Sequence, residues 1–199
     1  MDQSLRLLVG LGNPASSYHQ TRHNIGREFI DFLLKETKSA FQQSRQAEIF
    51  RLPVFFGLPL ESPLIGAKLL CYMNESGPAL KKVLDQENLG PQEILVLVDD
   101  FMIPFGSLRL RSGGSSGGHN GLQSIIETLG TEQFSRLRFG IGPTPEREDP
   151  ADFVLRHFSK MEKSKLPDIF KVAVDGLKII FQNGEARSMD FLNRKHLDP

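Results

Sequence analysis

The sequence predicts an α/β fold in which a mixed β-sheet is flanked by helices. Short apolar runs alternate along the chain with longer segments whose apolar residues recur at helical spacing. The middle third holds apolar runs too closely spaced for intervening helices, which adds antiparallel strands to the parallel ones. The chain has 199 residues, 39% of them hydrophobic, so it can bury a sizeable core, and we expect one domain over residues 1–199.

The first half of the chain predicts a strand, a loop and a helix, followed by several short strands. Residues 5–9 form an apolar run that ends at Gly10, and helical spacing begins at about Asn24. Further short strands are predicted at residues 49–52, 54–56 and 64–70, separated by Pro53, Gly57, Pro59 and Pro63.

The second half alternates helices and strands. Helices are predicted at residues 76–84, 121–129 and 166–181, and strands at residues 94–98, 107–111 and 137–141. The segment at residues 143–150 has three prolines and four charged residues, which is typical of a loop. We expect residues 143–158 to form a mobile loop or helical flap.

Composition narrows the classes of protein to which the chain can belong. Its 24 basic and 24 acidic residues exclude a bulk polycation, so any contact with nucleic acid must come from local clusters. Cys71 is the only cysteine, which excludes an intramolecular disulfide and a multi-thiolate metal site. The first residues do not resemble a signal peptide and no apolar run is long enough to span a membrane, so we expect a soluble cytoplasmic protein.

Two short motifs offer different chemistries. Gly10-x-Gly12-x-x-Ala15 matches the dinucleotide fingerprint, but Pro14 removes a backbone donor and no acidic residue ends a second strand at the required distance. Gly113-x-Ser115-x-Gly117 matches the nucleophile elbow of serine esterases, which makes Ser115 an alternative nucleophile. The glycine-rich surroundings make a chance match easy, and no buried apolar strand precedes this motif.

A third set of residues indicates hydrolysis by water. His23 is a natural general base near neutral pH, and Asp99 follows a predicted buried strand, where its carboxylate could fix the tautomer of the imidazole. Asn13, Asn74 and Asn120 lie on predicted turns, where their amides could bind peptide groups or donate to a developing oxyanion. Asparagines at strand ends also cap helices and close turns, so a purely structural role remains open for each.

A longer, ordered set of segments resembles the bacterial peptidyl-tRNA hydrolases over nearly the whole chain. The segments are Val9-Gly10-Leu11-Gly12-Asn13-Pro14, Tyr18, Thr21-Arg22-His23-Asn24-x-Gly26, Tyr72-Met73-Asn74-x-Ser76-Gly77, Asp99-Asp100, Pro104-x-Gly106, Gly117-Gly118-His119-Asn120-Gly121 and Arg136-Leu137-Arg138-x-Gly140-Ile141-Gly142. A collinear series of this kind is far more specific than either short motif above.

The resemblance implies a monomeric enzyme without metal or other cofactor that cleaves the ester between peptide and tRNA and so recycles tRNA from aborted translation. It implies His23 as the base that activates water, Asp99 as its partner, and Asn13, Asn74 and Asn120 as the groups that hold the substrate. Tyr18 and Met73 would shape the pocket beside them, and the role of Asp100 stays open. A branch of the family acts in chloroplast intron splicing, so a non-catalytic RNA-binding relative is a second alternative.

Local charge is consistent with a tRNA substrate. No acidic residue occurs between Phe101 and Ser124, whereas Arg109 and Arg111 do, and Arg136 and Arg138 lie on the next predicted strand. These four arginines are candidate contacts to tRNA phosphates.

Overall fold

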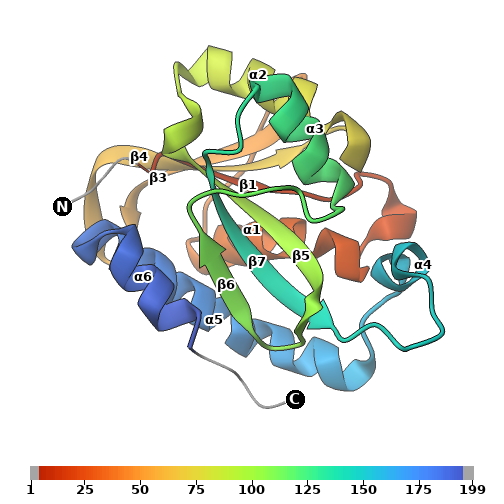
Figure 1. Cartoon of the computed structure of the whole chain (residues 1–199). Helices are drawn as coiled ribbons and strands as arrows, with labels where there is room; N and C mark the ends of the chain where they lie inside the picture. The colour runs from red at the N-terminus through yellow and green to blue at the C-terminus, as the bar shows by residue number, and fades with distance from the viewer. Residues whose placement is uncertain (1–4, 195–199) are drawn as a thin grey trace.

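The computed structural model describes residues 5–194, so the first and last residues of the predicted domain lie outside the described part. Its centre is one seven-stranded sheet in the order β2-β3-β4-β1-β5-β7-β6 (Figure 1). The strands are β1 (Leu7–Gly10), β2 (Gln42–Gln43), β3 (Ala47–Phe55), β4 (Leu58–Leu69), β5 (Ile94–Pro104), β6 (Leu108–Arg111) and β7 (Ser135–Gly142). The helices are α1 (Ile25–Glu36), α2 (Ser76–Glu87), α3 (Asn120–Leu129), α4 (Pro150–Leu155), α5 (Lys160–Asn183) and α6 (Glu185–Leu192), with short 3-10 turns η1 (Ser16–Tyr18), η2 (Arg22–Asn24), η3 (Met73–Glu75) and η4 (Pro91–Glu93).

The four central strands, β4, β1, β5 and β7, are parallel, and the strands at both edges are antiparallel. The mixed sheet expected from the sequence is therefore confirmed. From β1 the chain first reaches β4 on one side and then crosses to β5 on the other, so the strand order reverses at β1. In such sheets ligands bind outside the carboxyl ends of the strands at the point of reversal.

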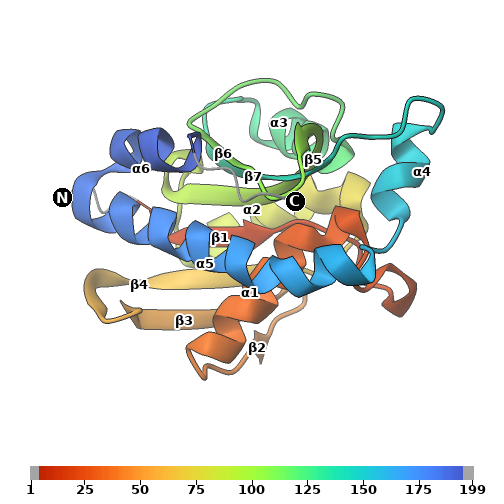
Figure 2. The same cartoon turned by 90° about the horizontal axis from the view of Figure 1, so that it is seen from below.

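Helices cover both faces of the sheet and bury two separate apolar cores (Figure 2). On one face α1 and α5 supply the buried side chains, among them Phe29 and Phe170, whose rings lie 5.4 Å apart. On the other face α2 and α3 pack through residues such as Leu80 and Ile125. Among the described helices, none combines the length and apolar composition needed to cross a membrane.

The prediction of broken strands in the middle third was wrong. Pro53 lies within β3, and Pro59 and Pro63 lie within β4, which pairs with β3 as one long hairpin turning at Gly57. Apart from the hairpin itself, each of these strands has one other neighbour, and each proline lies outside the pairing with it, because β2 pairs only with residues 48–49 of β3 and β1 only with residues 65–68 of β4. A missing N–H therefore costs no hydrogen bond on that side.

The second half agrees with the predicted order of elements, and the boundaries differ. The exposed and buried residues of β6 alternate as predicted. Helix α5 begins six residues earlier than residue 166, at a capping box in which the Ser159 hydroxyl and the Glu162 carboxylate each accept a backbone N–H. Helix α6 was not predicted from the sequence. Residues 143–149 form the predicted loop, and α4 follows it at the place of the predicted flap.

Candidate active site

A cavity of about 630 Å³ lies at the carboxyl ends of the parallel strands, where the strand order reverses. The seven residues proposed from the sequence for catalysis and substrate binding all line this one cavity. They are Asn13, Tyr18, His23, Met73, Asn74, Asp99 and Asn120. Residues separated by more than one hundred positions in the chain are thus brought to the same place.

The topology of the sheet explains this convergence. Asn13 follows β1, η3 with Met73 follows β4, and Asp99 lies two residues beyond Leu97, the partner of Gly10 on β5. The carboxyl ends of parallel neighbours point the same way, so the side chains after them meet at one edge. The start of α1 packs closely against this edge through its backbone. A Cβ at Gly10 would lie only 2.4 Å from the carbonyl oxygen of Gly26, so a residue with a side chain at Gly10 would push the helix away.

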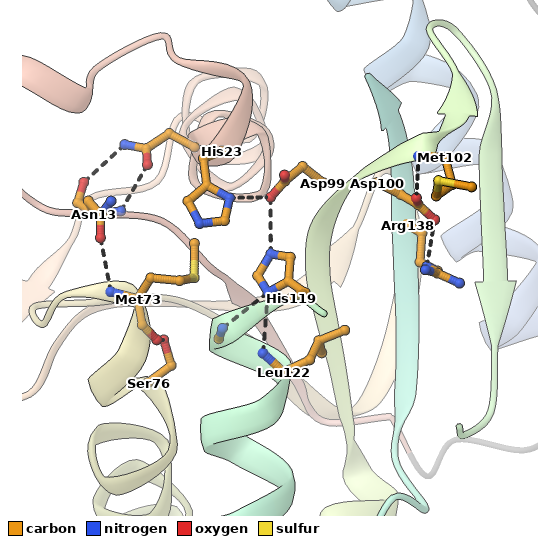
Figure 3. A network of polar contacts seen from close by, with 12 residues as sticks. Asn13, His23, Met73, Ser76, Asp99, Asp100, Met102, His119, Leu122 and Arg138 are labelled. Atoms are coloured by element: carbon orange, nitrogen blue, oxygen red, sulfur yellow. Dashed lines mark hydrogen bonds and ion pairs between the residues drawn. The ribbon is translucent and has the colours of Figure 1, made fainter. Parts of the chain in front are cut away.

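His23 and Asp99 form the central pair of the site (Figure 3). His23 Nδ1 lies 2.9 Å from Asp99 Oδ1, and the Asp99 side chain is buried. Because a carboxylate only accepts, Nδ1 carries the hydrogen and Nε2 is left as the basic nitrogen. Within the described residues, Nε2 has no hydrogen-bond partner. This is the tautomer that a general base requires.

The charges of the pair stabilise each other. Burial on its own lowers the pKa of His23, but the charge of Asp99 and its hydrogen bond outweigh burial, so the pKa is raised above its usual 6.5. Burial raises the pKa of Asp99, and the charges of His23 and His119, together with their hydrogen bonds, outweigh it and hold this pKa well below its usual range. Asp99 is therefore an anion at neutral pH.

His119 lines the cavity and contacts Asp99, although the sequence analysis did not single it out. Its Nε2 lies 3.1 Å from the same Asp99 oxygen, and its ring centroid lies 5.0 Å from that of His23. Its Nδ1 accepts from the backbone N–H groups of Gly121 and Leu122, so His119 is also the N-cap of α3 (Figure 3). Its place beside Asn120 in the glycine-rich motif was the available signal, but only the fold shows that it reaches Asp99.

The hydrogen bonds of His119 also bear on metal binding. His23, Asp99 and His119 offer three ligand atoms within 4.8 Å of one another. A metal on Nε2 of a neutral His119 would require a hydrogen on Nδ1, yet Nδ1 faces two backbone N–H donors. These contacts therefore fit a carboxylate that accepts one N–H from each histidine better than they fit a metal site.

Asn13 is fixed by hydrogen bonds on both its backbone and its side chain. The amide of Asn24 bonds the backbone N–H and C=O of Asn13 at 2.8 and 3.0 Å. Asn13 Oδ1 accepts from the N–H of Met73 at 2.9 Å, which assigns the two ends of the side-chain amide. Because Oδ1 takes the Met73 contact, the Nδ2 hydrogens of Asn13 remain available as donors, and no group of the described residues accepts from them. A donor of fixed orientation thus lines the cavity.

The other proposed substrate-binding residues differ in burial. Met73 is buried, whereas Asn74 and Asn120 are exposed to the cavity and Tyr18 is half-buried. The cavity is also lined by Val154 and Leu155 of α4. Most of the cavity surface is apolar, with the amides placed as isolated polar points, which is common in ligand sites.

The four candidate arginines occupy three kinds of position. Arg109 and Arg111 lie on the exposed face of β6. Arg138 lines the cavity and forms an ion pair with buried Asp100, with Nε 2.8 Å from Oδ2. Arg136 is only 2% exposed, and its guanidinium donates to the carbonyl oxygens of Gly114, Ser115 and Glu132. Arg136 therefore holds the glycine-rich loop, and its buried guanidinium is not placed to contact a phosphate.

The two short motifs do not assemble alternative sites. Ser115 is exposed, follows the edge strand β6 and does not line the cavity. Among the acidic residues that follow Ser115 in the chain, Asp149 caps α4 by accepting from the N–H of Ala151. In the dinucleotide-like motif, a Cβ at Gly12 would lie 2.5 Å from the Arg27 side chain, so this glycine permits close packing within the protein.

Comparison with known proteins places this architecture in a family. The family model described as peptidyl-tRNA hydrolase matches residues 7–199. The chain is 42% identical over 181 residues to a peptidyl-tRNA hydrolase of Methylacidiphilum infernorum, covering 89% of this chain and 92% of that protein. The chain belongs to the peptidyl-tRNA hydrolase family. It is therefore a hydrolase that acts on an ester bond.

Further relatives extend the agreement in sequence and in structure. A peptidyl-tRNA hydrolase of Cytophaga hutchinsonii is 40% identical over 189 residues, 95% of this chain and 98% of that protein. The crystal structure of peptidyl-tRNA hydrolase from Acinetobacter baumannii superposes with a TM-score of 0.86 at 29% identity, covering 98% of this chain and 97% of that one. The fold class expected from the sequence is thus confirmed over nearly the full length.

Proposed function

We propose that this chain hydrolyses the ester between the peptide and the terminal ribose of tRNA in peptidyl-tRNA, with a water molecule activated by His23. The supporting observation is the 2.9 Å contact between His23 Nδ1 and Asp99 at a cavity that His23 lines, which leaves Nε2 as the basic nitrogen. The family membership supplies the reaction, and this pair supplies a base suited to it.

In the proposed first step, His23 Nε2 takes a proton from water while the oxygen of that water attacks the ester carbonyl. The carbonyl oxygen becomes an oxyanion, and we assign its stabilisation to Nδ2 of Asn13, the donor left over by the Met73 contact. Asp99 stabilises the imidazolium that forms. The tetrahedral intermediate then breaks its bond to the ribose oxygen, which receives the proton from His23.

The proposed substrate contacts explain a preference for a blocked amino group. We assign the peptide to Asn74 and Asn120, with Tyr18 and Met73 shaping the pocket around its last residue. Amide groups of asparagine match the N–H and C=O of a peptide bond, whereas a free ammonium leaves them poorly paired. Aminoacyl-tRNA with a free amino group would therefore be a poor substrate.

The tRNA is proposed to lie along the β6 edge. Arg109 and Arg111 are exposed there and can contact phosphates, and Arg138 at the cavity is held by Asp100. We further propose that residues 143–158 act as a flap over the substrate, that the single domain works as a monomer without metal, and that it acts in the cytoplasm, where ribosomes release its substrate.

The deciding experiment measures release of an N-acetyl-amino acid from N-acetyl-aminoacyl-tRNA, beside unblocked aminoacyl-tRNA, with the His23→Ala variant, a chelator and a serine-directed phosphonate. The proposal expects hydrolysis of the blocked ester alone, indifferent to chelator and phosphonate and nearly abolished in His23→Ala. Inhibition by the phosphonate would instead assign the reaction to Ser115. Tight tRNA binding without hydrolysis would make the chain an RNA-binding relative.

A further inference from the structure

Arg22 is buried directly before the proposed base and is joined to the segment that follows α4. It is 8% exposed. Its backbone N–H donates to the carbonyl oxygen of Arg156 at 2.9 Å, and the preceding Thr21 forms an antiparallel bridge with His157. The chain entering η2 is therefore paired with the chain leaving α4.

The Arg22 side chain adds contacts to two more elements. Nη1 donates to the carbonyl oxygen of His157 at 2.5 Å, and Nη2 donates to both carboxylate oxygens of Glu162 at 2.9 and 3.0 Å. The guanidinium also lies over the rings of Phe153 and Phe158, 4.7 and 5.2 Å from their centroids. One buried cation thus connects η2, α4 and the start of α5.

Helix α4 has few other anchors. Phe153 is its only buried residue, and this is the ring on which Arg22 stacks. Behind it lies a second cavity of about 400 Å³, lined among others by Arg22, Phe105, Phe153 and Met161. Figure 2 shows α4 at one side of the molecule, next to the N-terminal end of α5. Because this second cavity lies against Phe153, apolar packing alone does not fix the position of α4.

The other side of α4 forms the wall of the catalytic cavity. Ala151, Val154 and Leu155 line that cavity, and Leu155 is 42% exposed. An apolar wall of this kind can bind the apolar part of a substrate only while the helix stays in place. The helix stays in place through the contacts of Phe153 and the segment after it.

We propose that Arg22 is a positioning residue for the reaction, which seats α4 so that Val154 and Leu155 form the substrate-facing wall. The inference rests on the proposed function only for the identity of that substrate. Arg22 does not touch the reacting atoms, and Asp99, which bonds His23, is held by β5. Its loss is therefore expected to weaken binding of substrate more than the chemical step.

The test compares Arg22→Gln and Arg22→Lys with wild type, and uses Lys160→Gln as the control. Lys160 is exposed at the start of α5, so its substitution removes the same charge from the same neighbourhood. The two readouts are steady-state hydrolysis of N-acetyl-aminoacyl-tRNA and amide hydrogen exchange over residues 150–157. Arg22→Gln should raise KM by roughly tenfold, the effect of losing about one apolar side chain from a binding wall, with a smaller change in kcat. Exchange over residues 150–157 should speed up.

Arg22→Lys should be intermediate, because an ammonium can pair with Glu162 but cannot also stack as a plane on Phe153. Lys160→Gln should match wild type. Any one of three results would overturn the proposal. These are an unchanged KM in Arg22→Gln, unchanged exchange over residues 150–157, and a fall in kcat alone that matches the fraction of the variant that is unfolded. If wild type itself fails to hydrolyse the ester, the proposed function fails, and the exchange measurement still decides whether Arg22 seats α4.

Discussion

Replacing Asp99 by asparagine tests the link between its charge and the basicity of His23. The amide is nearly the same size as the carboxylate, and its carbonyl oxygen can still accept from both histidines, so the geometry is kept and the charge is lost. Two unit charges 2.9 Å apart attract by about 6 kcal/mol at an effective dielectric constant of about 20, which is an upper limit. Opposite charges in proteins usually shift a pKa by about 1–3 units.

The direction of the shift follows from the balance at His23. In the wild type the charge of Asp99 outweighs burial and holds the pKa of His23 above 6.5, so activity should fall as the pH drops through that raised pKa. Asp99→Asn removes the charge that raises the pKa, so burial, the largest of the effects on His23, lowers the pKa relative to wild type. The acid limb of the pH profile should therefore move to lower pH.

The rate should fall at the same time, because the imidazolium formed in the transition state loses its counter-charge. A loss of about 1–3 pKa units corresponds to roughly 1.4–4 kcal/mol, or about 10- to 1000-fold in kcat/KM. The assay is kcat/KM for N-acetyl-aminoacyl-tRNA between pH 5 and pH 9. Asp100→Asn is the matched control, because this neighbouring buried acid pairs with Arg138 and not with His23.

Two results would refute this reasoning. An acid limb that stays in place or moves upward in Asp99→Asn would mean that Asp99 does not set the basicity of the group observed. A downward shift of the same size in Asp100→Asn would mean that general negative charge near the cavity, rather than the contact at 2.9 Å, controls the profile.

Three further predictions concern other parts of the molecule. His119→Asn keeps an acceptor for the N-terminal amides of α3, but the shorter side chain loses the contact to Asp99. Hydrolysis should therefore fall at least tenfold, while the free energy of unfolding in urea changes by less than about 1 kcal/mol. Equal losses of activity and stability would contradict the separation of the two roles. Arg109→Ala should lower the slope of log KM against log salt by about 0.9 for the tRNA substrate, because one phosphate contact is lost. Hydrolysis of a short minimal ester should not change. An equal effect on both substrates would remove Arg109 from the tRNA contacts. Gly26→Ala places a Cβ 2.2 Å from the carbonyl oxygen of Leu97. Calorimetry should show that the free energy of unfolding falls by at least roughly 1–3 kcal/mol. An unchanged melting temperature would show that α1 can shift freely.

The sequence by itself determined most of the order of the elements and most of the residues that line the cavity. Apolar periodicity is a local property, so the strand before Asp99 and the helix after Asn24 could be read directly, with boundaries a few residues off. The proposed catalytic groups could be found because parallel strands deliver the residues after their carboxyl ends to one edge. His23 and Asp99, which lie 76 positions apart, are 2.9 Å apart in space for this reason.

Tertiary structure alone decided the roles that depend on burial and on partners distant in the chain. Pro59 and Pro63 look like strand breakers until the strand register shows that β1, the second neighbour of β4, does not extend to them. Arg136 and Arg109 are the same residue type on adjacent strands, yet one is buried under the glycine-rich loop and the other faces solvent. Whether a cation holds a loop or is free to meet a phosphate depends on which groups the fold places around it, and residue type and spacing do not encode that.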